Sequence, residues 1–254
     1  MRHCLRLADF GDVLFFGPES AQASKQDALP GQAKWIPIPA LKGIQDYNQF
    51  MLRNLVHHVK TSHVLVIQWD GFITHPSQWR DAFLEWDYIG APWYHGDHPG
   101  MVGNGGFSLR SRRLLEALTD MPIDTRRPED VEICVHLHSL LSSRHGIRIA
   151  PLSLAQSFAC EYGPYRPSFG FHGMHNFAHV LDHQALNSWL ADAPAEILIH
   201  QHTRKLIKEL IQSGRSSEAR TLIRLRARHT GWTADQCMLM LRTLGPHNAA
   251  PRTA

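Results

Sequence analysis

The stretch His63-Val64-Leu65-Val66-Ile67 is a short apolar run, and Gln68-Trp69-Asp70-Gly71 follows it directly. Because the run is rich in Val and Ile and has no polar break, it predicts a strand buried on both faces, as in the parallel sheet of an α/β protein. Asp70 then lies at the carboxyl end of a central strand, where open α/β sheets bind ligands. Its carboxylate is a candidate ligand for a metal or a polar group. The alternative is that Asp70 only caps the turn at Gly71.

The segments around this strand alternate between extended and helical patterns, which predicts an α/β domain. Such a domain usually opens with a strand, but residues 2–8 have the pattern of a helix, so the first strand is missing from the prediction. The other predicted elements are a strand at 12–16, a polar loop at 19–34, an extended segment at 35–39, a helix at 45–60, a strand at 107–110, and helices at 111–118, from 128 to about 143 and at 154–161.

Length and composition describe an ordinary globular protein. The chain has 254 residues, of which 43% are hydrophobic and 19% charged, enough for one substantial core and an appendage. The first ten residues carry charges throughout and do not resemble a signal peptide. The four cysteines lack C-x-x-C spacing, and the 18 histidines form no metal motif. We therefore expect a cytoplasmic protein with reduced thiols.

The net charge of +3 is unevenly distributed. Residues 204–252 carry ten Lys/Arg and three Asp/Glu, a local charge of +7, so the remainder, with 16 basic and 20 acidic residues, has −4. The main domain therefore lacks the basic surface of a nucleic-acid-binding protein. The basic tail, predicted to be helical with a disordered end at 246–254, is typical of a solvated face, which we favour. Peripheral contact with anionic lipid at the inner membrane face is the alternative.

A glycine-rich stretch, Gly103-Asn104-Gly105-Gly106-Phe107-Ser108, precedes the predicted strand at 107–110. Three glycines in four residues permit close approach of the backbone to a ligand. The order of glycines is not that of a dinucleotide-binding loop, and no Gly-Lys-Ser/Thr occurs in the chain. A β-bulge or a tight bend is the alternative reading.

Two further motifs follow. Glu129 and Asp130 come directly after Pro128 at the start of a predicted helix, where acidic residues are favoured by the helix dipole. The functional interpretation is a general base whose position is fixed by the helix start. His172 lies between Gly170-Phe171 and Gly173, and such a histidine is either a metal ligand or a structural residue. Taken alone, the residues favour the structural interpretation of His172.

In order, Gln68-Trp69-Asp70, the glycine stretch, Pro128-Glu129-Asp130 and His172 resemble the motifs of GT-A glycosyltransferases. The phrases Gln-Trp-Asp-Gly-Phe, Asp-Tyr-Ile-Gly-Ala-Pro-Trp and Phe-Gly-Phe-His-Gly are similar to an uncharacterised, mainly bacterial glycosyltransferase-like domain family. The resemblance covers roughly residues 1–180. It implies a Rossmann-like mixed central sheet flanked by helices at 1–185, without the first strand, and a helical C-terminal extension at 186–254.

The resemblance also implies an activity. Asp130, assisted by Glu129, would be the base that accepts the proton of an acceptor hydroxyl. Asp70 and His172 would hold Mn²⁺ or Mg²⁺ together with the diphosphate of a nucleotide-sugar donor, and the acceptor would be a glycan or a lipid-linked sugar. Arg110 would either face the diphosphate or only pair with a helix. The implied donor site comprises Gln68, Trp69, Asp70, Gly103, Asn104, Gly105, Gly106, Ser108 and Arg110.

The chain departs from the family pattern at Gln68, which replaces the first acid of the metal motif. The missing first strand is the place where these folds usually recognise the nucleotide base. Two alternatives therefore remain from the sequence. One is a degenerate, non-catalytic module that binds a nucleotide or a carbohydrate. The other is a metal-dependent phosphohydrolase using Asp70, Asp130 and His172, which would need a second cluster of metal ligands.

Overall fold

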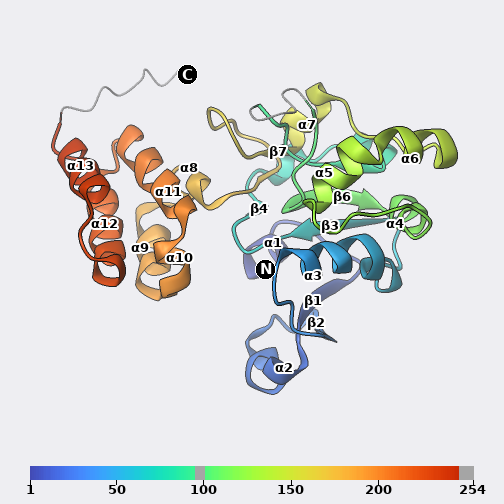
Figure 1. The fold of residues 1–254 in the computed structure, drawn as a ribbon, viewed down its shortest axis with the longest axis horizontal. Helices are drawn as coiled ribbons and strands as arrows, with labels where there is room; N and C mark the ends of the chain where they lie inside the picture. Colours follow the sequence, from blue (N-terminus) through green and yellow to red (C-terminus); the bar gives the residue numbers. More distant parts are fainter. Residues whose placement is uncertain (95–100, 246–254) are drawn as a thin grey trace. The chain divides into compact units, whose positions relative to one another are not determined.

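The computed structural model describes residues 1–94 and 101–245 and shows a mixed α/β protein (Figure 1). Residues 95–100 and the predicted disordered end at 246–254 lie outside the described residues. The chain divides into two compact units, Met1–His172 and Gly173–Ala254. The division comes earlier than the expected boundary at 185/186. None of the described helices is both long and apolar enough to cross a membrane.

The sheet that carries the site has three strands in the order β3-β6-β5. β3 spans His63–Ile67, as predicted, and pairs antiparallel with β6 (Phe107–Ser111), which in turn pairs antiparallel with β5 (Tyr88–Ile89). The other strands form two small sheets: parallel β1 (Val13–Pro18) and β2 (Ala33–Ile38), and β4 (Phe72–Ile73) with β8 (Gly170–Phe171) and β7 (Ala159–Cys160).

The prediction of a parallel central strand buried on both faces is wrong for β3. It pairs antiparallel, with Ile67 opposite Phe107, and all five of its residues are only half-buried. The reason is that β3 lies at the edge of its sheet, with β6 on one side and no strand hydrogen-bonded to it on the other within the described residues.

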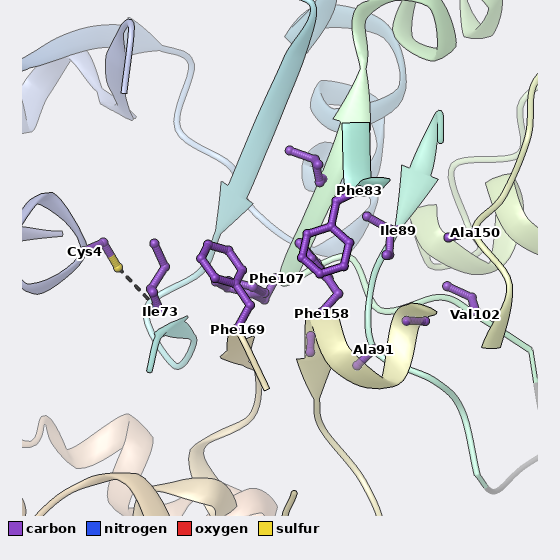
Figure 2. Close-up of a cluster of buried hydrophobic side chains, with 13 residues drawn as sticks. Cys4, Ile73, Phe83, Ile89, Ala91, Val102, Phe107, Ala150, Phe158 and Phe169 are labelled. Carbon is purple, nitrogen blue, oxygen red and sulfur yellow. Dashed lines mark hydrogen bonds between the residues drawn. The ribbon is translucent and has the colours of Figure 1, made fainter. Parts of the chain in front are cut away.

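The two faces of this sheet carry different cores because side chains alternate along each strand. Leu65 and Phe107 belong to the face that packs on the aromatic cluster drawn in Figure 2. On the other face, Tyr88 packs with residues of the helices at 112–118 and 132–145, and Val66 packs on the helical segment at 50–59. The labelled cluster in Figure 2 comprises Cys4, Ile73, Phe83, Ile89, Ala91, Val102, Phe107, Ala150, Phe158 and Phe169.

Most predicted helices of the first unit are present, with irregular turns. The helix expected at 45–60 is α3 (Ile44–Gln49) followed by a π-helical turn (Phe50–Asn54) and a 3₁₀ turn (Leu55–His57). The loop expected at 19–34 instead contains α2. The remaining helices are α1 (Arg2–Leu5), α2 (Glu19–Lys25), α4 (Arg112–Leu118), α5 (Glu129–Val131), which continues as a π-helical turn (Glu132–His136), α6 (His138–His145) and α7 (Leu152–Phe158).

The second unit is helical, as predicted for the C-terminal extension. Buried Leu206, Leu210 and Leu222 lie on facing helices of this unit. The last helix begins with a capping box between Thr233 and Gln236. Its helices are α8 (Phe177–Val180), α9 (His183–Asp192), α10 (Ala195–Ile199), α11 (Gln201–Gln212), α12 (Ser216–Thr230) and α13 (Ala234–Arg242).

Candidate functional site

Segments that are far apart in the sequence meet at one edge of the β3-β6-β5 sheet. Because β3 and β6 are antiparallel, the carboxyl end of β3 and the amino end of β6 share this edge. The amide of Gln68 donates to the carbonyl of Gly106 at 2.8 Å, which joins the Gln68-Trp69-Asp70 segment to the glycine loop. The start of α5 and His172, just after β8, lie against the same loop. The structure thus brings the four sequence motifs together.

His172 lies at the centre of a group of polar side chains at this edge of the sheet. Its Nε2 lies 3.2 Å from an Asp70 carboxylate oxygen, and its Nδ1 lies 3.1 Å from a Glu161 carboxylate oxygen. The Gln68 side-chain oxygen is 3.2 Å from Nε2, and the Asn104 amide nitrogen is 3.1 Å from Nδ1. Each ring nitrogen therefore faces one carboxylate and one amide.

The two carboxylates decide the charge of this histidine. Burial lowers the pKa of His172, but the hydrogen bonds and charges of Asp70 and Glu161 outweigh burial and raise that pKa to about 10. His172 is therefore an imidazolium at neutral pH. It links the end of β3 to Glu161, which follows β7.

The glycines of the loop make room for protein side chains. A Cβ on Gly105 would overlap the Glu129 carboxylate, and a Cβ on Gly106 would overlap the His172 imidazole. The prediction that these glycines admit a ligand to the backbone is corrected here, because the space in front of both residues is already filled. Glycine at these two positions lets Glu129 and His172 approach the loop from different directions.

Asn104 shapes the loop. It has a positive φ of 64°, an uncommon conformation that asparagine tolerates better than most residues. Its side-chain oxygen accepts the amide protons of Gly106 at 3.0 Å and Phe107 at 3.3 Å. The side-chain nitrogen is thereby directed at His172. Asn104 thus fixes the turn of the loop beside the imidazole.

Arg110 and Glu129 form a buried ion pair beneath the loop. The guanidinium Nη2 lies 2.6 Å from Glu129 Oε1, and both side chains are almost inaccessible. Arg110 also donates to Ser108 Oγ at 3.0 Å and lies over the Tyr88 ring. Ser108 and Arg110 are fully buried, so the expected contact of Ser108 with the donor is corrected. Of the two roles expected for Arg110, the structure shows the pairing with the helix start.

Asp130 lies at the same helix start and is only partly exposed. One of its carboxylate oxygens accepts the Gly105 amide proton at 3.2 Å, and the other accepts the Val131 amide proton. Burial, followed by the neighbouring charge of Glu129, raises the pKa of Asp130 to about 7. A carboxyl that titrates near neutral pH is suited to general-base catalysis.

This raised pKa predicts a pH-dependent stability. Because the folded pKa of about 7 exceeds the ordinary value of 3.8, the stabilisation from protonated Asp130 is complete below pH ~4 and is lost as the pH rises through 7. Between pH 5.5 and 8, wild type should lose about 2 kcal/mol of unfolding free energy relative to Asp130→Asn, from ~1.4 kcal/mol per pKa unit. Urea unfolding at both pH values measures this difference.

Asp124→Asn is the matched control for the pH experiment. The neighbouring Arg126 holds the pKa of Asp124 at about 2, below the measured window, so this variant should follow wild type from pH 5.5 to 8. Parallel profiles for wild type and Asp130→Asn would show that Asp130 is already ionised throughout that range.

Two residues of the site, Glu161 and Tyr47, were not predicted as functional residues from the sequence. Glu161 was expected only as the end of the helix at 154–161, and Tyr47 only as part of the helix at 45–60. The structure places the Tyr47 hydroxyl 2.7 Å from the Gln68 side-chain nitrogen, and burial raises the Tyr47 pKa. No motif marks either residue, because their roles depend on the pairing of β7 with β8 and on the packing of α3.

The remaining predicted residues are placed as follows. Asp70 is buried and Trp69 is exposed, with 57% of its surface accessible. Gly103 packs so closely on the Trp93 ring that a Cβ would overlap the ring. Gln68 contacts both Tyr47 and His172. Trp69 and Gln68 therefore stay in the predicted donor site, whereas Gly103 has a packing role.

The side chains at the site fit the predicted metal ion only in part. Within residues 1–94 and 101–245, no group of three or more His, Cys, Asp or Glu side chains is arranged to hold a metal ion. The Asp70 and His172 ligand atoms are 3.2 Å apart, close to the roughly 3.0 Å between neighbouring ligands of an octahedral ion with 2.1 Å bonds. Two protein ligands suit Mg²⁺ or Mn²⁺ when substrate phosphates complete the shell.

The chain was compared with known protein families, curated proteins and solved structures. A family model described as a protein of unknown function (DUF5672) covers residues 32–172, more than half of the chain. No curated protein and no solved structure matches the chain. The matched region contains the whole Asp70, Asn104, Asp130 and His172 network.

Proposed function

The chain belongs to the DUF5672 family, and we propose that it is a metal-dependent glycosyltransferase with a GT-A-like fold. It would transfer a sugar from a nucleotide diphosphate donor to an acceptor hydroxyl, with inversion at the sugar carbon. The observation that carries the proposal is that two carboxylates, Asp130 and Asp70, lie at one edge of the sheet in different environments. Asp130 has a pKa near 7, and Asp70 lies against a histidine that Glu161 orients.

The two environments support different tasks. Asp130 would accept the proton of the acceptor hydroxyl while the acceptor oxygen bonds to the sugar carbon and the bond from that carbon to the diphosphate breaks. The Gly105 amide and the helix start hold its carboxylate in place. Glu129 would not take the proton, since its carboxylate is bound to Arg110 beneath the loop. Glu129 therefore positions Asp130 and raises its pKa.

Asp70 and His172 would hold the donor diphosphate through a divalent ion. His172 Nδ1 would keep its hydrogen bond to Glu161, the arrangement that orients metal-bound histidines in proteins. Its Nε2 proton, which Asp70 stabilises in the absence of an ion, would have to leave. The ion would neutralise charge on the departing nucleoside diphosphate.

A non-catalytic module is the second candidate, and Gln68 is the observation that favours it. In place of the first acid of the motif, Gln68 bonds to Tyr47 and His172, so the protein offers a single carboxylate at the diphosphate position. Such a site would bind a nucleotide without turning it over. The phosphohydrolase alternative would need a second cluster of metal ligands, and no group of three or more His, Cys, Asp or Glu side chains in the described residues is arranged to hold a metal ion.

Thermal unfolding with UDP, GDP, CDP or dTDP, each with Mn²⁺ or with EDTA, tests the proposal. A ligand that binds only the folded state stabilises it by ~2.7 kcal/mol at a hundred times its dissociation constant. For a chain of this size that corresponds to a rise in midpoint of roughly 5–10 °C. We expect one nucleotide to produce this rise with Mn²⁺ and not with EDTA. No rise with any of the four would contradict a nucleotide-dependent function.

A further inference from the structure

The last helix of the second unit exposes large apolar side chains. On α13, Leu239 is buried, whereas Met238 and Leu241, which are three residues apart, lie on the other side of the helix. Trp232 just before α13 and Leu244 just after it are exposed as well, and all four side chains are between 55% and 70% accessible. We call Trp232, Met238, Leu241 and Leu244 the α13 patch. Apolar side chains that gather in one exposed stretch mark an interaction surface, unlike those scattered singly.

A row of arginines lies next to this patch, on α12, which packs beside α13 (Figure 1). Arg220, Arg224 and Arg228 are four residues apart and therefore share one face of α12. The Arg220 guanidinium donates to the carbonyl of Thr243 at 3.2 Å, which joins this face of α12 to the end of α13. Arg224 and Arg228 are exposed. We call these three residues the arginine row.

The positive charge of these helices is not neutralised within the second unit. Residues 201–245 carry nine Lys/Arg and three Asp/Glu, a local charge of +6. The three acidic residues, Glu209, Glu218 and Asp235, each pair with another basic side chain of the unit, so none of them neutralises the exposed Arg224 or Arg228. The surface therefore offers positive charge to an anionic partner.

Arg242 brings charge and apolar surface together on α13 itself. It follows Met238 by four residues, and its guanidinium is 4.0 Å from the Met238 sulfur. An arginine in this position can keep its charge at a polar boundary while its stem covers apolar side chains. Trp232 suits the same boundary, because its indole has an apolar body and a polar N–H. Aliphatic, aromatic and arginine side chains in this combination are typical of a helix that lies in a membrane interface.

We propose that the second unit binds an anionic lipid surface, with the α13 patch entering the interface and the arginine row contacting the headgroup phosphates. A nucleic acid fits less well, because its phosphates would engage the arginines but leave Met238, Leu241 and Leu244 in water. The sequence alone favoured a solvated basic face, since it does not show which apolar residues are exposed. This inference goes beyond the proposed sugar transfer and does not depend on it.

The test uses the whole chain with a fluorophore on Cys237. Cys237 is exposed next to Met238, whereas Cys4, Cys134 and Cys160 are buried, so a polarity-sensitive maleimide dye labels this position selectively. The labelled protein is titrated with vesicles of phosphatidylcholine, alone or with about 30% phosphatidylserine. We expect a blue shift that saturates with the anionic vesicles, at least ~10-fold weaker binding to the neutral vesicles, and weaker binding in ~0.5 M salt, which screens exposed charges.

The charged contribution is measured by removing two arginines of the row. Arg224→Gln combined with Arg228→Gln should weaken binding to the anionic vesicles ~25-fold, from about 5-fold for each arginine near an anionic surface. Arg144→Gln, which removes an exposed arginine of the first unit, is the matched control and should bind like wild type.

The apolar contribution is measured on the α13 patch. Met238→Ser combined with Leu241→Ser should weaken binding by about 10-fold or more, because two apolar side chains no longer leave water. Both residues are exposed, so the variant is expected to fold, which circular dichroism checks. Leu84→Ser, an exposed leucine of the first unit, is the matched control.

Four results would overturn the proposal. The first is the absence of a dye shift with any vesicle, and the second is equal binding to neutral and anionic vesicles. If the dye is already shielded without lipid in a dimer that Leu241→Ser dissociates, a second copy of the chain covers the patch. If single-stranded RNA shifts the dye as far as the anionic vesicles do, the partner is a nucleic acid. None of these readouts involves nucleotide-sugar or metal binding.

Discussion

Glu129→Gln is expected to lower the free energy of unfolding by about 3–5 kcal/mol, the range for removing one partner of a buried ion pair. The substitution leaves the guanidinium of Arg110 fully buried without its carboxylate. Arg110 keeps its hydrogen bonds to Ser108 and to the Gly105 carbonyl, but these neutral acceptors do not replace a charge. Urea denaturation of wild type and variant measures the loss.

The exposed pair of Arg112 with Glu116 provides the matched control. Its side chains are 43% and 55% accessible, so Glu116→Gln should cost less than about 1 kcal/mol. A double-mutant cycle with Arg110→Met and Glu129→Gln should show a coupling of about 1–3 kcal/mol, because the double variant leaves no unpaired charge. Equal, small losses for Glu129→Gln and Glu116→Gln would mean that the buried pair does not hold the loop.

Asp130→Asn is expected to reduce turnover by 10²–10⁴-fold, the usual contribution of a general base, while leaving nucleotide binding intact. An amide of nearly the same shape keeps an acceptor for the Gly105 or Val131 amide but cannot take a proton at neutral pH. The effect is therefore expected in kcat and not in the dissociation constant of the donor. Release of nucleoside diphosphate from the donor identified by thermal unfolding measures turnover.

Wild-type activity should also rise with pH through about 7, since the base acts only when Asp130 is ionised. Asp124→Asn, on the surface near the same helix, should leave both turnover and pH profile unchanged. Wild-type turnover in Asp130→Asn would remove this carboxylate from the chemistry. Nucleotide binding by wild type without turnover would instead support the non-catalytic module.

Local pattern was enough to predict the elements that place the site. The boundaries of β3 match the apolar run at 63–67, and β6 begins at Phe107 directly after the glycines. The helix start at Glu129 follows Pro128, as expected for a residue that cannot donate to a preceding turn. Each of these signals lies within a few residues of the element that it predicts.

The pairing of the strands was not predictable in the same way. The apolar run of β3 indicated burial on both faces. The direction of its partner strand depends on contacts between residues forty or more positions apart, such as Ile67 and Phe107. The same holds for Glu161 beside His172, which depends on the pairing of β7 with β8. Sequence pattern predicted the residues of the candidate site, whereas tertiary pairing decided that Arg110 lies beneath the loop and that Glu161 joins the site.

Thermal unfolding of wild type and Asp70→Asn with Mn²⁺ and the selected nucleoside diphosphate tests the central claim most directly. Asp70 is the one carboxylate assigned to the metal and diphosphate, and asparagine keeps its shape without its charge. The account predicts a rise in midpoint of roughly 5–10 °C for wild type with Mn²⁺ and at most half of that rise for Asp70→Asn. An equal rise in both proteins, or one that persists in EDTA, would contradict metal-dependent donor binding at this site.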